Sequence, residues 1–302
     1  MMLLKNLVLY RLPVQWSVDA DELEQKLAQQ PLQPCGGFQM ESRGWMRPQE
    51  DDERYVYRQQ RQWLIALGLE QKLLPASIIR QVAQDRASDI ARQQGRPVGR
   101  KQMRDLRELV TNELLPRALA RRSVTHCWID DANGWLAIDT AADTKAEQFM
   151  EVLRRSDDRM QALRLETQRS PASAMAEWLG RGDAPGTFGI DQDLELISAD
   201  GSKAVVRYAR HNLEGREIRD HLSSGKTVVR LGLTWNDRIS FILTENMQIK
   251  RVTFLNILKR ESDSELEDKG ELFANDFALM TGELSLMLAD LVKSLGGEKE
   301  KD

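Results

Sequence analysis

The stretch "QQGRPVGRKQMRDLRELV", residues 93–110, contains a turn between two helical patterns. Gly95, Pro97 and Gly99 interrupt the periodicity, because proline and glycine are poor residues for a helix interior. The apolar residues before the turn recur at helical spacing, and so do those after it. They are Ile79, Ala83, Ala87 and Ile90 before it, and Met103, Leu106, Val110 and Leu114 after it. The sequence therefore predicts an antiparallel helical hairpin over residues 76–115, which Pro116 ends.

Strand patterns lie on both sides of this hairpin. Residues 62–75 form an apolar run that ends at Pro75, and the strands "HCWID" and "GWLAID" enclose the tight-turn pair Asn133-Gly134. Further elements of the N-terminal half are expected as a strand over 4–12, a helix over 19–30 capped by Asp19 or Asp21, and a helix over 144–155.

The C-terminal half begins with residues 156–200, which are polar and weakly patterned, so we expect them to connect to a second domain. A helical pattern over 214–225 ends at Gly225, and a long amphipathic helix from Phe273 to Leu295 ends at Gly296-Gly297, before a frayed tail "EKEKD". Four strands are expected at 203–210, 226–235, 238–244 and 249–254.

These patterns predict an α+β protein with antiparallel sheets, an inserted helical hairpin and a long C-terminal helix. We expect three domains: residues 1–75 with 116–158, the hairpin 76–115 as a tip, and residues 159–302.

The composition excludes several classes of protein. Of the 302 residues, 41% are hydrophobic and 30% charged, and no apolar run is long enough to span a membrane. The N-terminus lacks the pattern of a signal peptide, and only two cysteines occur, so we expect a reduced, cytoplasmic protein.

Catalytic and cofactor motifs are absent from the sequence. The three histidines lack metal-ligand spacing, and "GRPVGRK" departs from the Walker phosphate loop. His126 beside Cys127 would face the opposite side of a strand, which argues against a thiol–imidazole pair. We expect no metal, no cofactor and no enzymatic activity.

Charge is distributed unevenly along the chain. Residues 76–125 hold eleven Lys or Arg and five Asp or Glu, although the whole chain has a net charge of −4. Arg100, Arg104 and Arg107 fall on one helix stripe, and arginine forks suit phosphate oxygens. No aromatic residue interleaves them, which favours binding to the duplex backbone without base readout. The alternative is a solvated helix face with ion pairs such as Arg104–Glu108.

Several ordered stretches resemble one family from end to end. They are "KNLVLYRL" (5–12), "PCGG" (34–37), "GW" (44–45), "KLLP" (72–75), "LLPRA" (114–118), "WIDDANGWLAIDT" (128–140) and "LMTGELSLMLADLVKSLGGE" (279–298). In their order and spacing they are similar to the bacterial recombination-associated RdgC proteins.

This resemblance implies a homodimer that forms a closed ring, with a positively charged hole for duplex DNA. It implies sequence-independent DNA binding at the nucleoid, restraint of RecA-promoted strand exchange, and no membrane association; single-stranded DNA is a further candidate ligand. The candidate DNA-binding residues are Arg92, Arg96, Arg100, Lys101, Arg104, Arg107, Arg117, Arg121 and Arg122.

The resemblance also implies residues for the dimer contacts. One contact would involve Leu119, where family members carry phenylalanine, together with Arg210 and His211. The C-terminal helix would supply the other through Leu284, Leu288 and Leu291. Two other functions stay open: a nuclease-like enzyme whose carboxylates meet only in the fold, and a scaffold whose basic hairpin docks an acidic partner.

Overall fold

The computed structural model describes residues 4–13, 16–49, 51–255 and 269–299. Its strands are β1 Leu7–Arg11, β2 Glu41–Met46, β3 Val56–Gln59, β4 Gln62–Lys72, β5 Ala120–Asp130, β6 Trp135–Asp139, β7 Leu163–Arg164, β8 Phe188–Ser198, β9 Val205–Tyr208, β10 Lys226–Trp235, β11 Ile239–Thr244 and β12 Gln248–Phe254. Its helices are α1 Ala20–Ala28, α2 Ala76–Gln94, α3 Arg100–Leu114, the 3-10 turn η1 Leu115–Arg117, α4 Asp143–Ser156, α5 Pro171–Arg181, α6 Arg216–Ser223 and α7 Lys269–Ser294.

The strands form one twelve-stranded sheet in the order β2-β4-β5-β6-β1-β12-β11-β10-β8-β9, with β3 beside β4 and β7 beside β1. The named strands pair antiparallel throughout. The α+β class and the antiparallel pairing are confirmed, although a single sheet replaces the several that were expected. β1 joins the two halves of this sheet, since it pairs with β6 on one side and β12 on the other.

Helices cover both faces of the sheet. Along β1, Val8 and Tyr10 point into a core closed by α1 and α4, whereas Leu7 and Leu9 point into a core closed by α7 and α5. This alternation is the period-two pattern of a strand buried on both faces. Asp19 caps α1 as predicted, because its side chain accepts hydrogen bonds from the backbone N–H groups of Asp21 and Glu22.

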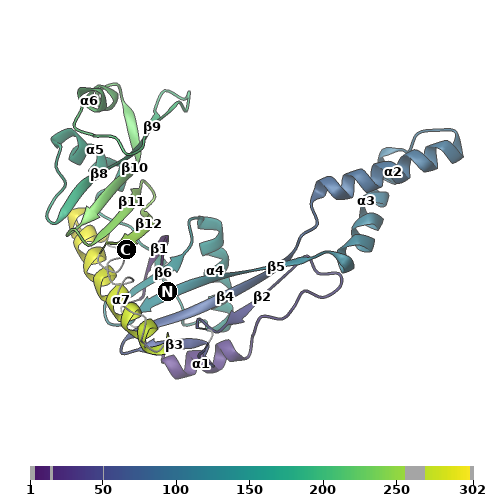
Figure 1. The fold of residues 1–302 in the computed structure, drawn as a ribbon, viewed down its shortest axis with the longest axis horizontal. Helices are drawn as coiled ribbons and strands as arrows, with labels where there is room; N and C mark the ends of the chain where they lie inside the picture. Colours follow the sequence, from purple (N-terminus) through teal and green to yellow (C-terminus); the bar gives the residue numbers. More distant parts are fainter. Residues whose placement is uncertain (1–3, 14–15, 50, 256–268, 300–302) are drawn as a thin grey trace.

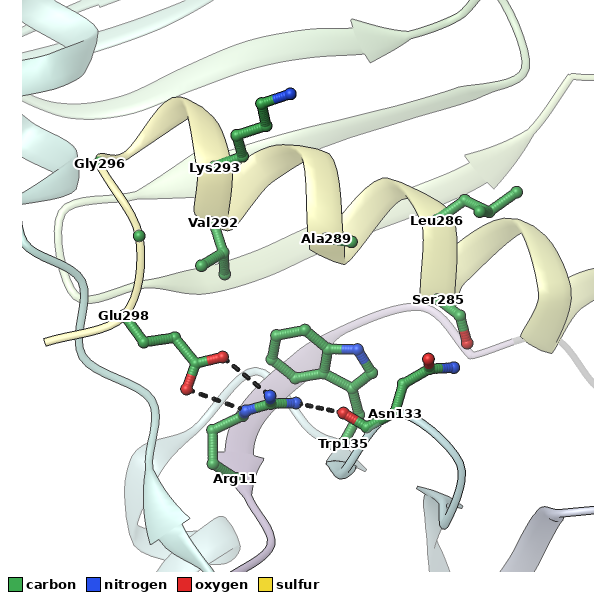
Figure 2. A pocket seen from close by; sticks show the side chains of 11 residues that line it. Arg11, Asn133, Trp135, Ser285, Leu286, Ala289, Val292, Lys293, Gly296 and Glu298 are labelled. Carbon is green, nitrogen blue, oxygen red and sulfur yellow. Dashed lines mark hydrogen bonds and ion pairs between the residues drawn. The ribbon is translucent and has the colours of Figure 1, made fainter. Parts of the chain in front are cut away.

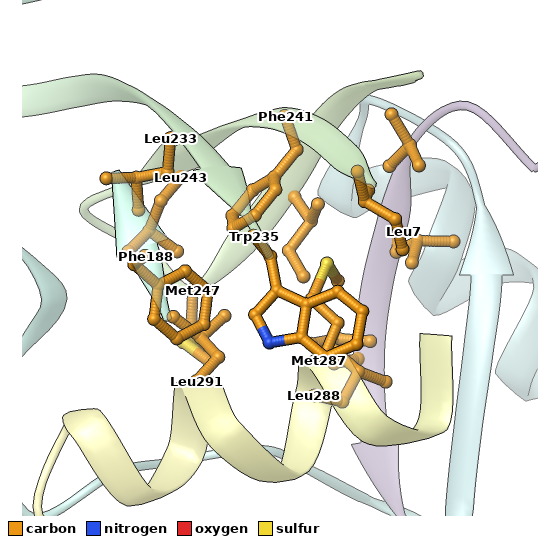
Figure 3. Close-up of a cluster of buried hydrophobic side chains, with 14 of the residues drawn as sticks. Leu7, Phe188, Leu233, Trp235, Phe241, Leu243, Met247, Met287, Leu288 and Leu291 are labelled. Carbon is orange, nitrogen blue, oxygen red and sulfur yellow. The ribbon is translucent and has the colours of Figure 1, made fainter. Parts of the chain in front are cut away.

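Helix α7 provides the largest part of the second core (Figure 3). Met287, Leu288 and Leu291 pack against Trp235 and Phe241 of the sheet, and the Trp235 indole N–H donates to Asp290 at 2.9 Å. The expected dimer contact through the C-terminal helix needs correction here. Its three residues are fully buried within their own chain, so they are not available to a partner: Leu284, Leu288 and Leu291.

Two local predictions were wrong in part. Residues 156–200 contain α5 and the eleven-residue β8; the strand was missed because its outer face is charged and leaves a weak apolar pattern. The predicted turn at Asn133-Gly134 is present, since the β5–β6 connection spans residues 131–134 and Gly134 has a positive φ of 72°. The tail is not frayed at its start, since Lys299 N donates to the Glu166 carbonyl; residues 300–302 lie outside the described residues.

The molecule is crescent-shaped in Figure 1. The α2–α3 hairpin projects at one end, α6 and β9 lie at the other, and α7 runs along the convex edge. The hairpin is thus spatially separate, while the boundary near residue 158 stays a prediction.

Candidate nucleic-acid interface

The α2–α3 hairpin has a small core of its own. Ala83 and Ala87 of α2 pack against Leu106 and Val110 of α3, and the two alanines allow a close approach of the helices. Gly95 ends α2 with φ at 69°, a left-handed conformation that glycine adopts without strain. Both predicted helices and the turn between them are confirmed.

A buried lysine fixes the base of the hairpin. The Lys72 side chain, in a residue only 7% exposed, donates from Nζ to the Leu115 carbonyl at 2.9 Å and to the Gly37 carbonyl at 3.2 Å. The Leu73 N–H also donates to the Leu119 carbonyl at 2.7 Å. These bonds join the end of α3 to β4 and hold the hairpin in position. A lysine at the end of the apolar strand β4 is the one sign of this role in the sequence.

Glu70 extends the network at the base. It accepts the Cys35 N–H at 2.8 Å and the Arg122 guanidinium at 2.9 Å. These two hydrogen bonds, together with the positive charge of Arg122, lower the pKa of the Glu70 carboxyl. Of the nine predicted DNA-binding residues, Arg122 is therefore engaged in a structural ion pair.

The other eight predicted cations are exposed on the hairpin and at its base. Arg92 and Arg104 approach Asp89 and Asp105 at 3.6 and 3.8 Å, which are long, exposed ion pairs. The remaining six have no ion pair within 4.0 Å to a carboxylate of the described residues. These six, named the free cations from here on, are Arg96, Arg100, Lys101, Arg107, Arg117 and Arg121.

The ion pairs of a solvated helix face are scarce on this hairpin. The Arg104–Glu108 pair of that alternative is not among the ion pairs of the described residues. Arg86 instead reaches across to Glu113 at 2.7 Å and ties α2 to α3. Arg100, Arg104 and Arg107 are all exposed, on a stripe of α3 beside its buried Leu106 and Val110. The geometry leaves a row of positive charge facing solvent.

Comparison with known proteins identifies the chain's relatives. The sequence model of one protein family, described as "Putative exonuclease, RdgC", matches residues 2–298. The recombination-associated protein RdgC of Janthinobacterium sp. (strain Marseille) is 47% identical over 98% of this chain and 99% of its own length. Proteins of the same name from Dechloromonas aromatica (strain RCB) and Burkholderia orbicola (strain MC0-3) are each 48% identical, over 97% and 98% of this chain and 97% and 96% of theirs.

The chain belongs to the RdgC family. The resemblance seen in the sequence is thereby confirmed over nearly the whole length, and with it the association with recombination.

The residues expected at the first dimer contact lie far apart in this RdgC family member. Leu119, 78% exposed, precedes β5 at the hairpin base, whereas Arg210 and His211 follow β9 at the opposite end of the crescent (Figure 1). The His211 ring lies 5.2 Å from that of Tyr208, whose hydroxyl is 3.0 Å from His221 Nε2. Within one chain, Leu119 therefore does not contact Arg210 or His211.

Burial shifts the pKa values of two neighbouring side chains of β5. Burial raises the pKa of the Cys127 thiol well above its ordinary value, and burial lowers the pKa of His126. Cys127 packs in the core under α1 and α4 and is not paired with its neighbour. Among the described residues, no three His, Cys, Asp or Glu side chains are grouped to hold a metal ion. No helix of the described ranges is both long and apolar enough to cross a membrane.

Proposed function

We propose that this chain binds duplex DNA through the phosphate backbone, without reading the bases, by means of the α2–α3 hairpin. The observation that carries the proposal is the set of six free cations, five of them arginine. At 1.5 Å per residue, Arg100 and Arg107 are separated by about 10 Å along α3. That separation spans about three phosphates of one strand, at 3.4 Å each. Uncompensated, exposed arginines in such a row suit a polyanion.

We further propose that two copies form a closed ring around the duplex. Two crescents related by a twofold axis can place the hairpin base of each, at Leu119, against Arg210 and His211 of the other copy. This single contact would occur twice and close the ring. The exposed Leu119 supports such a contact, since a large apolar side chain gains most when it is covered. No contact through the buried leucines of α7 is needed.

In this proposal the ring limits RecA-promoted strand exchange by occluding the duplex, and the protein acts in the cytoplasm at the nucleoid. The ring retains DNA topologically, so that moderate phosphate contacts from two hairpins suffice. The acidic remainder of the surface directs DNA to the basic hairpins, because the chain as a whole is negatively charged.

The test is a charge reversal on the hairpin. The triple variant Arg100→Glu, Arg104→Glu, Arg107→Glu should bind duplex DNA much more weakly in a gel-shift assay while it sediments like the native protein. Because all three side chains are exposed, the hairpin core is left intact. Affinity equal to that of the native protein would remove the hairpin from the mechanism.

An exonuclease is the second candidate, favoured by the description of the family model. Linear duplex DNA incubated with the protein and Mg²⁺ separates the two functions. Nucleotide release supports an exonuclease if the activity co-purifies with the protein and an Asp→Asn change abolishes it. Intact DNA that is shifted in the gel would support the non-enzymatic binding protein.

A further inference from the structure

A groove on the convex edge of the molecule lies apart from the hairpin. Its volume is about 790 Å³, and it runs between the C-terminal half of α7, the β5–β6 turn and the segment that follows α7 (Figure 2). One wall is apolar, and its Leu286 is 60% exposed. Its exposed apolar residues are Leu286 and Ala289 of α7, whereas Trp135 and Val292, which also line the groove, are almost fully buried.

Arg11 lies in the groove in a fixed orientation. Its guanidinium carbon is 3.9 Å from the centroid of the Trp135 ring, and Nη1 donates to the Asn133 carbonyl at 2.6 Å. Its Nε and Nη2 donate to the two carboxylate oxygens of Glu298 at 3.1 and 2.8 Å (Figure 2). The arginine thus already binds a carboxylate with both arms of its fork, which is the strongest geometry for this pair.

The Glu298 carboxylate can be exchanged without disturbing the fold. Its side chain is 40% exposed, so a competing carboxylate can reach the pair from solvent. The surrounding backbone is held separately, because Gln168 N donates to the Gly297 carbonyl and Lys299 N to the Glu166 carbonyl, both at 3.0 Å. The side chain can therefore turn away while the segment keeps its place.

We propose that this groove docks a partner protein through an acidic segment in which a carboxylate lies next to a large apolar side chain. Arg11 takes the carboxylate in place of Glu298, and the wall around Leu286 takes the apolar group. Lys293 adds a second positive charge at the rim, and it is exposed without an ion pair within 4.0 Å among the described residues. Nucleic acid would use the cations but leave the apolar wall uncovered. Glu298 acts as an internal competitor that keeps the site occupied when the partner is absent.

The experiment is a fluorescence-anisotropy titration of the full chain without DNA. The probe is a fluorescein-labelled Asp-Asp-Asp-Leu-Phe peptide with a free C-terminal carboxylate, and the control peptide replaces the aspartates with lysines. Arg11→Gln should weaken binding about 10-fold or more, since it removes a charge-assisted hydrogen bond. Glu298→Gln should strengthen binding about threefold or more, because it removes the carboxylate that competes for Arg11. If the Arg11–Glu298 pair only stabilised the fold, Glu298→Gln would not increase the affinity for the peptide.

A matched control is Arg181→Gln, which removes an exposed arginine paired with Glu177 elsewhere on the surface and should leave peptide affinity unchanged. Equal binding of the lysine peptide, or unchanged affinity in both Arg11→Gln and Glu298→Gln, would overturn the proposal. Leu286→Glu should weaken binding of the peptide without changing the sedimentation coefficient. If it instead converts dimers to monomers, the groove is an interface between two copies of the chain, and the proposal is wrong. The titration contains no DNA, so its result is independent of the proposed DNA binding.

Discussion

Removal of two free cations from the hairpin should lower the salt dependence of DNA binding by a defined fraction. The double variant Arg100→Gln, Arg107→Gln neutralises two exposed side chains and leaves the buried Leu106 and Val110 of the hairpin core in place. Glutamine favours helix about as well as arginine does, so α3 should persist. The change therefore acts on charge alone.

The size of the effect follows from the count of free cations. If each of the six neutralises one phosphate, log affinity should fall with log salt with a slope of about −5.4, at about 0.9 per phosphate. Four remaining cations give about −3.6. If both hairpins of a dimer engage the duplex, both slopes double, but the variant still retains about two-thirds of the native slope. The ratio is thus the robust quantity.

The assay is fluorescence anisotropy on a labelled 30-base-pair duplex over a series of salt concentrations. The matched control is Arg155→Gln, Arg181→Gln, which removes two arginines that are each 72% exposed but paired with Glu151 and Glu177. It loses the same charge and should keep the native slope. A hairpin variant whose slope equals that of the native protein, or a control whose slope falls equally, would refute the reasoning.

Three further predictions concern the hairpin base, the dimer and acid stability. Lys72→Met should lower the free energy of unfolding by about 2 kcal/mol, because it leaves the Leu115 and Gly37 carbonyls without their buried donor; denaturant unfolding measures this, and no loss would exclude the anchor. Leu119→Glu should give monomers in sedimentation velocity while the circular-dichroism spectrum stays native, and an unchanged sedimentation coefficient would exclude Leu119 from the contact. Hydrogen bonds from Arg159 and Lys26 hold the pKa of Asp157 well below its ordinary 3.8, so the stability that this carboxylate contributes is present above pH 3.8 and lost as the pH falls below it. Asp157→Asn should therefore be less stable at pH 7 and show a flatter loss below pH 4, and an identical acid limb would contradict the assignment.

Strong periodicity made much of the fold predictable. The hairpin, the long C-terminal helix and the four C-terminal strands have apolar residues at regular spacing, and all of them form. β8 was missed because its outward side chains Asp191, Asp193 and Glu195 dilute the apolar signal of Phe188 and Leu194. A strand that buries only one of its faces and carries charge on the other therefore resembles a polar linker in sequence.

The sequence identified charged residues of the candidate interface but not their partners. Arg122 and Arg121 are adjacent in the chain, yet only Arg122 meets a carboxylate, since cross-strand pairing places it opposite Glu70. Similarly, helical periodicity marks Leu284 and Leu288 as apolar but cannot tell whether they cover their own sheet or a second copy. Register and packing decide both questions, and they arise from contacts between distant segments.

The most direct test of the central claim compares closed-circular with linear duplex DNA of the same sequence. Protein is bound at low salt, the salt is raised to weaken phosphate contacts, and the fraction still on DNA is measured by sedimentation. A ring that encircles the duplex should stay on the closed circle and slide off the free ends of the linear molecule. Equal retention on both DNAs would contradict encirclement by two basic hairpins.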